Sequence, residues 1–231
     1  NLDGKATLLR RPNAKGKTIQ NEVKLLSTTR VKGIILQRYT FRLSCDGSPF
    51  YVGESSFGYF DKSALEHQAG FTGMENARPW LEGKRITPAQ LTLRRQTQLD
   101  FIADLQMLPD GGRHKQGYAL GYVPVKPDDW YFKCHFYQDP VMPGSLGIAA
   151  AEQALRVVSG IKGEMRDATG VETVWRYRGQ ISPGTEQMTV EVHIKTINQV
   201  DGVVRVIGDA GVYRDGTLIY DIRDLAIASA S

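Results

Sequence analysis

A histidine ahead of a proline–glycine turn is the part of this sequence whose residue types could do chemistry. His135 precedes Pro143 and Gly144, and an apolar, helix-forming run begins at that glycine. Neutral imidazole is a suitable base near pH 7. The first N–H groups of a helix lack intrahelical partners and can stabilise a developing negative charge. His135 could therefore remove a proton beside a thioester carbonyl while the Gly144 N–H donates to the carbonyl oxygen, a contact worth roughly 3 to 4 kcal/mol.

The elements that must position these two residues lie on either side of them. Residues 130–132 are an aromatic, β-prone run, which predicts a short extended segment leading to His135. Residues 145–158 have helix-forming composition with apolar residues at helical spacing, so a helix is expected to begin at about Gly144. Its middle is small and apolar, with no charge before Glu152, which favours burial on most sides.

The run from His135 to Gly147, HFYQDPVMPGSLG, resembles the signature of the β-hydroxyacyl-thioester dehydratases of the hot-dog fold, of the β-hydroxydecanoyl carrier-protein type. Weaker similarity extends over most of residues 100–228. The resemblance implies a hydro-lyase that removes water from a 3-hydroxyacyl chain on a phosphopantetheine thiol, giving the trans-2-enoyl thioester. It makes His135 the catalytic base and Gly144 the oxyanion glycine.

Two further segments narrow the resemblance. Asn1-Leu2-Asp3-Gly4 and the FGYF run at 57–60 are similar to the dehydratase regions of polyunsaturated fatty acid synthases and related iterative polyketide synthases, where two hot dogs are fused in one chain. The resemblance implies an α+β double hot dog, in which each long helix is wrapped by a curved antiparallel sheet and the two sheets join edge to edge. An acyl tunnel would run between the lobes. The residues expected to bind substrate at its mouth are Phe136, Val141, Met142 and Ser145.

An ungapped internal repeat supports two related halves. Residues 17–51 and 186–220 share a pattern at a constant offset of 169, with the Asp-Gly turn at Asp46 matching the one at Asp215. Each copy has the pattern of a strand, a glycine turn, a second strand, an Asp-Gly turn and a third strand. We interpret both copies as the closing strands of a hot dog.

The repeat leads to a domain assignment. Residues 1–60 are expected to be the closing strands of a first hot dog that is incomplete at its N-terminal side, with its helix upstream of this chain. Residues 61–98 are polar and broken by glycine and proline, which predicts a surface linker, anchored by Trp80 and Leu81. Residues 99–231 are expected to form the complete second hot dog.

The sequence departs from the family at the catalytic acid. The family carries Asp or Glu five residues after the oxyanion glycine, and here that position is Ala149. One hypothesis is that His135 works with a carboxylate on the upstream helix, since in dimeric members the histidine of one subunit works with the acid of the other. Alternatively, Glu152, about 4.5 Å further along the helix, replaces the acid, or the domain is inactive or altered.

Composition sets the remaining limits. The chain has 231 residues, 41% of them hydrophobic, a net charge of +4 and a pI near 9.0. The basic residues are dispersed, which argues against nucleic-acid binding and suits encounter with an acidic acyl carrier protein. Neither a membrane span nor a signal peptide is indicated, so a cytoplasmic location is expected. Two cysteines suggest a reducing compartment, and a thiol mechanism at Cys134 is disfavoured because strand neighbours point to opposite faces.

The other expectations concern ligands, partners and competing functions. His67, His114 and His193 are expected on the surface or on strand faces, and no spacing suggests a metal site. No cofactor is expected beyond the carrier's phosphopantetheine arm. The expected partners are the acyl carrier protein and the upstream half of the first hot dog, and homodimer formation stays open. Two alternatives to the dehydratase are a hot-dog acyl thioesterase and a catalytically silent acyl-binding or structural module.

Overall fold

The computed structural model describes residues 2–31, 33–61, 69–74, 76–94, 97–200 and 202–229. Its strands are β1 (Asp3–Leu8), β2 (Ile19–Val31), β3 (Ile34–Cys45), β4 (Ser48–Phe60), β5 (Ala89–Thr92), β6 (Asp104–Leu108), β7 (Tyr118–Val123), β8 (Met165–Asp167), β9 (Glu172–Tyr177), β10 (Met188–Val200), β11 (Val203–Arg214) and β12 (Thr217–Ser229). The helices are α2 (Trp130–Cys134) and α3 (Gly144–Val158). The helix predicted over 145–158 is therefore α3, and it begins at Gly144.

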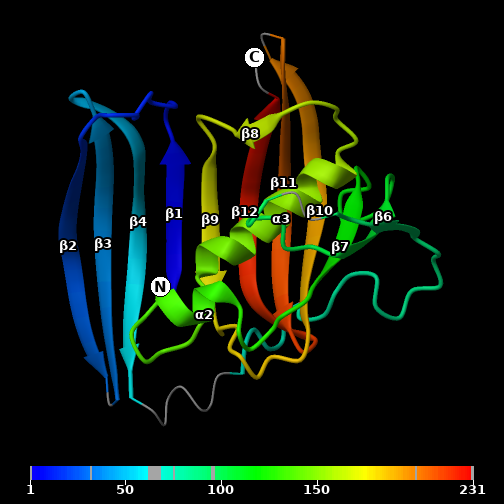
Figure 1. Ribbon diagram of the computed structural model, residues 1–231, viewed down its shortest axis with the longest axis horizontal. Helices are drawn as coiled ribbons and strands as arrows, with labels where there is room; N and C mark the ends of the chain where they lie inside the picture. The colour runs from blue at the N-terminus through cyan, green and yellow to red at the C-terminus, as the bar shows by residue number, and fades with distance from the viewer. Residues whose placement is uncertain are drawn as a thin grey trace.

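All described strands belong to one antiparallel sheet. Their order is β2-β3-β4-β1-β9-β12-β11-β10-β7-β6-β5, and β8 pairs with β12. In Figure 1, α3 crosses in front of β9, β12, β11 and β10, whereas β2, β3, β4 and β1 have no helix in front of them. We refer to β1–β4 as the first strand set and to β9–β12 as the second strand set. No helix in the described residues combines the length and apolar character needed to cross a membrane.

The internal repeat is confirmed by the bounds of the strands. Each strand of the first set begins and ends 169 residues before its counterpart, so that β1 matches β9, and β2, β3 and β4 match β10, β11 and β12. A register shift between Leu25 and Ser27 recurs between Ile194 and Thr196. The two Asp-Gly turns have positive φ at both residues, as type I′ hairpin turns require.

The two strand sets meet at β1 and β9, which pair antiparallel about a pseudo-twofold axis. In this pairing Lys5 lies opposite Val174. Val174 is also the repeat equivalent of Lys5, so an axis between these two residues exchanges the two sets. The same hydrogen-bonded ladder that holds each set together therefore also joins the two sets.

The hydrophobic core lies between α3 and the second strand set. The buried side of α3 consists of Leu146, Gly147, Ala150, Ala151, Ala154 and Leu155. The predicted burial of α3 on most sides is confirmed: of its 15 residues only Ser145 and Arg156 are exposed, and the others are buried or half-buried. Small side chains in the middle of the helix allow a close approach to the strands.

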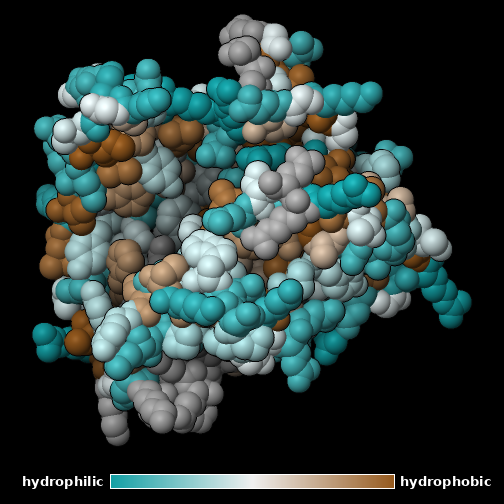
Figure 2. Space-filling view, viewed as in Figure 1, coloured by the Kyte–Doolittle hydropathy of each residue, from teal (hydrophilic) through white to brown (hydrophobic). Residues whose placement is uncertain are grey.

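The first strand set has an apolar inner face without such a cover. Val23 and Leu25 are 56% and 49% exposed, whereas their repeat equivalents Val192 and Ile194 are 1% and 0% exposed. Figure 2 shows a hollow beside α3 over this part of the sheet. The difference follows from the absence of a helix over the first set within the described residues.

The segment predicted as extended before His135 is helical instead. Residues 130–134 form α2, and Tyr131 and Phe132 are buried side by side. The turn before the helix is fixed by Asp129, whose carboxylate accepts the Lys126 N–H at 2.9 Å and the Tyr131 hydroxyl at 2.8 Å. These local bonds and the burial of two neighbouring aromatic rings outweigh the β-propensity of the run.

The segment predicted as a linker contains a strand and a half-buried anchor. β5 lies within it and pairs with β6 at the edge of the sheet. Trp80 donates its backbone N–H to the Glu191 carboxylate at 2.6 Å, and its ring packs 5.0 Å from that of Tyr118. Glu191 also accepts the hydroxyls of Tyr118 at 3.1 Å and Tyr213 at 2.7 Å. Trp80 is therefore an anchor, as predicted.

Candidate active site

His135 follows the last residue of α2 and has a fixed tautomer. Its backbone N–H donates to the Tyr131 carbonyl at 3.1 Å, and its Nδ1 lies 2.9 Å from the Val141 carbonyl oxygen. A carbonyl oxygen can only accept, so Nδ1 carries a proton and the neutral ring keeps a lone pair on Nε2. The half-buried imidazole is thus arranged to accept a proton at Nε2.

The loop after His135 holds the Val141 carbonyl in place. The Val141 N–H donates to the Asp139 carbonyl at 2.9 Å, and the Met142 N–H donates to the Ile181 carbonyl at 2.9 Å. The side chains of Val141 and Met142 are buried in the core. The orientation of the imidazole is therefore set by backbone contacts on both sides of its acceptor.

The other residues predicted to bind substrate lie in different surroundings. Phe136 is 57% exposed, and its ring centroid lies 4.0 Å from that of His135. Ser145 is exposed in the first turn of α3. Of the four predicted residues, two contact the base in the described interactions: Phe136 through its ring and Val141 through its backbone carbonyl.

Gly144 is the first residue of α3, and a side chain there would collide with a tyrosine. A Cβ atom on Gly144 would lie 2.7 Å from the Tyr177 ring and 3.2 Å from the Tyr177 hydroxyl oxygen. One turn later, a Cβ on Gly147 would lie 2.7 Å from the Tyr220 ring. Close packing of α3 on these two rings explains both glycines.

Ala149, at the position of the family's acid, and Glu152 differ in whether they can transfer a proton. Ala149 is half-buried and carries no ionisable group. Glu152 is 20% exposed, and its carboxylate lies 3.6 Å from the Arg156 guanidinium. Burial raises the pKa of Glu152 to about 7, nearby Asp167 contributes in the same direction, and Arg156 opposes it. Burial raises the pKa of Tyr51 in the first strand set, and the charges of Asp167 and Glu152 act in the same direction.

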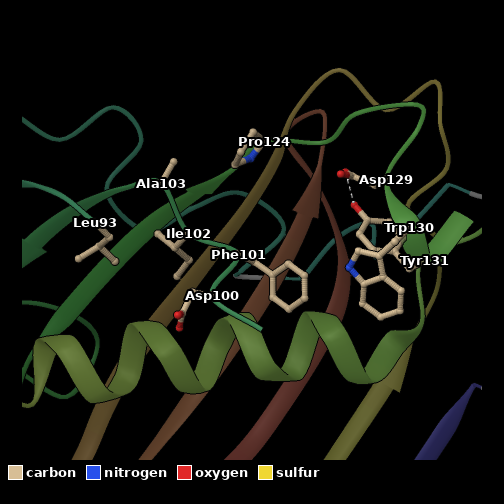
Figure 3. A pocket seen from close by; sticks show the side chains of 9 residues that line it. All are labelled: Leu93, Asp100, Phe101, Ile102, Ala103, Pro124, Asp129, Trp130 and Tyr131. Carbon is tan, nitrogen blue, oxygen red and sulfur yellow. Dashed lines mark hydrogen bonds between the residues drawn. The ribbon is translucent and has the colours of Figure 1, made fainter. Parts of the chain in front are cut away.

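A cavity of about 140 Å³ lies near α2, beside α3 (Figure 3). It is lined by Leu93, Asp100, Phe101, Ile102, Ala103, Pro124, Asp129, Trp130 and Tyr131. Nearby, the Gln153 side chain of α3 accepts the N–H groups of Phe101 and Ile102. Neither His135 nor Gly144 lines this cavity, so it is not the predicted tunnel mouth.

The remaining histidines lie outside this site. His114 is exposed, as expected. His193 lies on a strand face, one of the two expected positions, but it is not at the surface: it is 1% exposed because its ring packs against those of Tyr118 and Trp80. His67 lies outside the described residues.

Comparison with known proteins identifies the family. A family model described as the FabA-like domain matches residues 93–223, which is more than half of the chain and includes both His135 and Gly144. The chain belongs to the FabA-like domain family. The hot-dog dehydratase resemblance of the motif at 135–147 is therefore confirmed at the level of the family.

A curated protein and several solved structures are similar to this FabA-like chain. It is 29% identical, over 266 aligned residues, to one of the polyunsaturated fatty acid synthase subunits of a Thraustochytrium species, and the alignment covers all of this chain and 18% of that protein. The FabA-like chain thus spans about a fifth of the length of this curated relative.

Solved structures show a similar fold at low identity. The tesB protein of Mycobacterium avium subs. paratuberculosis has a TM-score of 0.52 at 13% identity, covering 99% of this chain and 78% of that one. A structure from Novosphingobium aromaticivorans has a TM-score of 0.51 at 13% identity, covering 100% and 79%. At this identity the likeness concerns the fold of the FabA-like chain alone.

Proposed function

We propose that this chain is part of a 3-hydroxyacyl thioester dehydratase that acts on acyl chains carried by acyl carrier protein within a fatty acid or polyketide synthase. The observation that carries the proposal is the hydrogen bond from His135 Nδ1 to the Val141 carbonyl, which keeps Nε2 free to accept a proton. The start of α3 at Gly144, the FabA-like match and the polyunsaturated fatty acid synthase relative support it.

In the proposed reaction His135 Nε2 takes the proton from C2 of the substrate. The Gly144 N–H donates to the thioester oxygen, on which negative charge develops. The electron pair of the broken C2–H bond forms the C2=C3 double bond as the C3–O bond breaks. The hydroxyl group leaves as water after it receives a proton from a carboxylic acid. The thioester bond to the phosphopantetheine arm stays intact, and no further cofactor takes part.

We propose that the acid comes from a helix that covers the first strand set and completes a double hot dog. Ala149 cannot transfer a proton. The exposed inner face of β1–β4 and the pseudo-twofold axis between Lys5 and Val174 support this arrangement, because rotation about the axis carries α3 onto that face.

We infer that the proposed covering helix differs from α3 of a second copy. Gly208 lies under α3, and a Cβ added to it would lie 3.1 Å from the Leu155 side chain. There is therefore little space for a side chain at position 208. The repeat equivalent of Gly208 is Tyr39, whose ring packs 5.8 Å from that of Phe57. A leucine at the same place on a second α3 would collide with Tyr39, so the proposed helix carries a smaller residue there.

The first test measures the action of the base in a reaction that does not need the acid. Exchange of the C2 proton of a 3-hydroxyacyl thioester in D₂O requires a base and an oxyanion donor but no acid, so it can be measured on the 231-residue chain. We expect exchange in the wild-type chain and a loss of about 10²-fold or more in His135→Asn. His114→Asn, an exposed histidine elsewhere, is the matched control and should exchange normally. Equal exchange in wild type and His135→Asn would refute the assignment of the base.

The products of the same incubation decide between competing functions. When a polypeptide that includes the covering helix is supplied, a dehydratase forms the conjugated enoyl thioester, which is followed by its ultraviolet absorbance. Release of free carrier thiol without enoyl product would identify a thioesterase instead. Binding of the acyl thioester with neither exchange nor turnover would identify a silent module.

A further inference from the structure

Tyr177 presents a hydroxyl group to the start of α3. It is the last residue of β9, and its hydroxyl oxygen lies 3.2 Å from the place where a Gly144 Cβ would stand. Gly144 is the first residue of α3, where the free N–H groups of the helix begin. The Tyr177 side chain therefore shares the location of the proposed oxyanion donor.

The Tyr177 hydroxyl makes no hydrogen bond within the described part of the chain. The residue as a whole is only 7% exposed, but its oxygen is not sealed from solvent, so the ring is packed while the hydroxyl stays accessible. A phenylalanine would fill the space of the ring equally well. An unpaired, accessible phenol beside Gly144 is therefore suited to bind a ligand.

Neighbouring contacts hold the ring in this orientation. The Tyr177 and Tyr220 rings lie 4.3 Å apart at 44°, and the Tyr177 backbone N–H donates to the Leu2 carbonyl at 2.6 Å. Tyr220 contacts Gly147 through its ring carbons, and its hydroxyl is not among the atoms nearest to that glycine. Of the two stacked tyrosines, Tyr177 is the one whose oxygen lies beside Gly144.

The repeat shows where the phenol occurs. The pair Tyr177 and Tyr220 in the second strand set matches the pair Leu8 and Tyr51 in the first. The ring of Tyr220 has an equivalent in both sets, whereas the phenol of Tyr177 is replaced by Leu8. The hydroxyl is thus present only in the half that also contains His135 and Gly144.

We propose that the Tyr177 hydroxyl donates a second hydrogen bond to the thioester carbonyl oxygen, beside the Gly144 N–H. The proposal rests on the proposed function and assigns a further catalytic residue to the same site. Burial raises the pKa of Tyr177 well above its usual value, and the neighbouring Tyr220 and Tyr51 act in the same direction. The phenol therefore stays protonated and acts as a donor at every pH at which His135 can act as a base.

The test compares Tyr177→Phe with Tyr220→Phe. Both changes remove one oxygen atom and keep the stacked rings, so both variants should fold, which a thermal melt checks. We expect Tyr177→Phe to lower the rate constant of C2 exchange at saturating substrate by about 10²-fold, as for loss of one oxyanion donor. The apparent KM and the shape of the pH profile should stay unchanged. Tyr220→Phe should stay within about threefold of wild type.

A spectroscopic measurement tests the contact itself. Infrared difference spectra of a bound acyl thioester labelled with ¹³C at the carbonyl report the hydrogen bonds to that oxygen. The band should move to lower frequency on binding to wild type and move less on binding to Tyr177→Phe. Equal rates and equal band positions in wild type and Tyr177→Phe would overturn this inference alone. Absence of exchange in the wild-type chain would instead overturn the proposed function.

Discussion

Glu152 should make the stability of this chain depend on pH in a direction opposite to that of most carboxylates. Burial raises the pKa of Glu152 from 4.5 to about 7 in the folded chain, with Asp167 adding to the effect and Arg156 opposing it. Between these two values the folded chain holds a proton that the unfolded chain has lost. The stability contributed by protonated Glu152 is therefore fully present below pH 4.5 and is lost as the pH rises through about 7.

The size of the effect follows from the shift. One pKa unit corresponds to about 1.36 kcal/mol, so a shift from 4.5 to about 7 corresponds to about 3 kcal/mol. Glu152→Gln has a similar shape and no ionisation. We expect its free energy of unfolding, relative to wild type, to rise by about 2 to 3 kcal/mol between pH 5 and pH 8.

Urea unfolding of the wild type and the variant at both pH values measures this difference. Glu164→Gln is the matched control, because Arg166 lowers the pKa of that exposed carboxylate and its removal should give no gain at high pH. The reasoning fails if the difference between Glu152→Gln and wild type is the same at pH 5 and pH 8.

Two further predictions concern the bare sheet face and a buried histidine. In urea unfolding of the 231-residue chain, Val192→Ala should lower the free energy of unfolding by about 2 kcal/mol. Val23→Ala, at the equivalent position of the repeat, should lower it by less than about 0.5 kcal/mol because Val23 is exposed. Similar losses in the two variants would show that the first face is already covered. Burial lowers the pKa of His193 below 6.5, so the folded chain resists a proton that the unfolded chain accepts. The stability of the folded chain should therefore fall as the pH drops below about 6.5. A urea midpoint that falls as steeply between pH 7 and pH 5 in His193→Gln as in wild type would contradict this.

The repeat and α3 could be predicted from the sequence because both rest on local signals. The Asp-Gly turns at Asp46 and Asp215 fix the hairpins, and small apolar residues at helical spacing mark α3. These signals depend on turn geometry and periodicity, which act over a few residues. The family could be predicted from one segment, 135–147, because a proline–glycine turn after a histidine is a specific pattern.

Other features depend on contacts between distant segments. The aromatic run at 130–132 forms a helical turn because burial of Tyr131 and Phe132 in the core, together with the local bonds of Asp129, outweighs the β-propensity of the run. A glutamate such as Glu191 is typical of a solvent-facing strand position, yet the segment at Trp80 covers it. The position of Tyr177 under Gly144 required the pairing of β9 with β12. A comparison of Leu8 with Tyr177 at the offset of 169 was the one sequence signal that could have identified this phenol.

The seam between β1 and β9 shows what joining two related halves in one polypeptide permits. In a pair of identical chains, the residue at the centre of this seam would lie opposite its own copy, and a lysine there would face a lysine, which is unfavourable. Here Lys5 lies opposite Val174, and its ammonium group is 3.3 Å from the carboxylate of Glu172. Covalent fusion thus frees the central position to carry different side chains on its two sides, so each half can specialise without disturbing the junction.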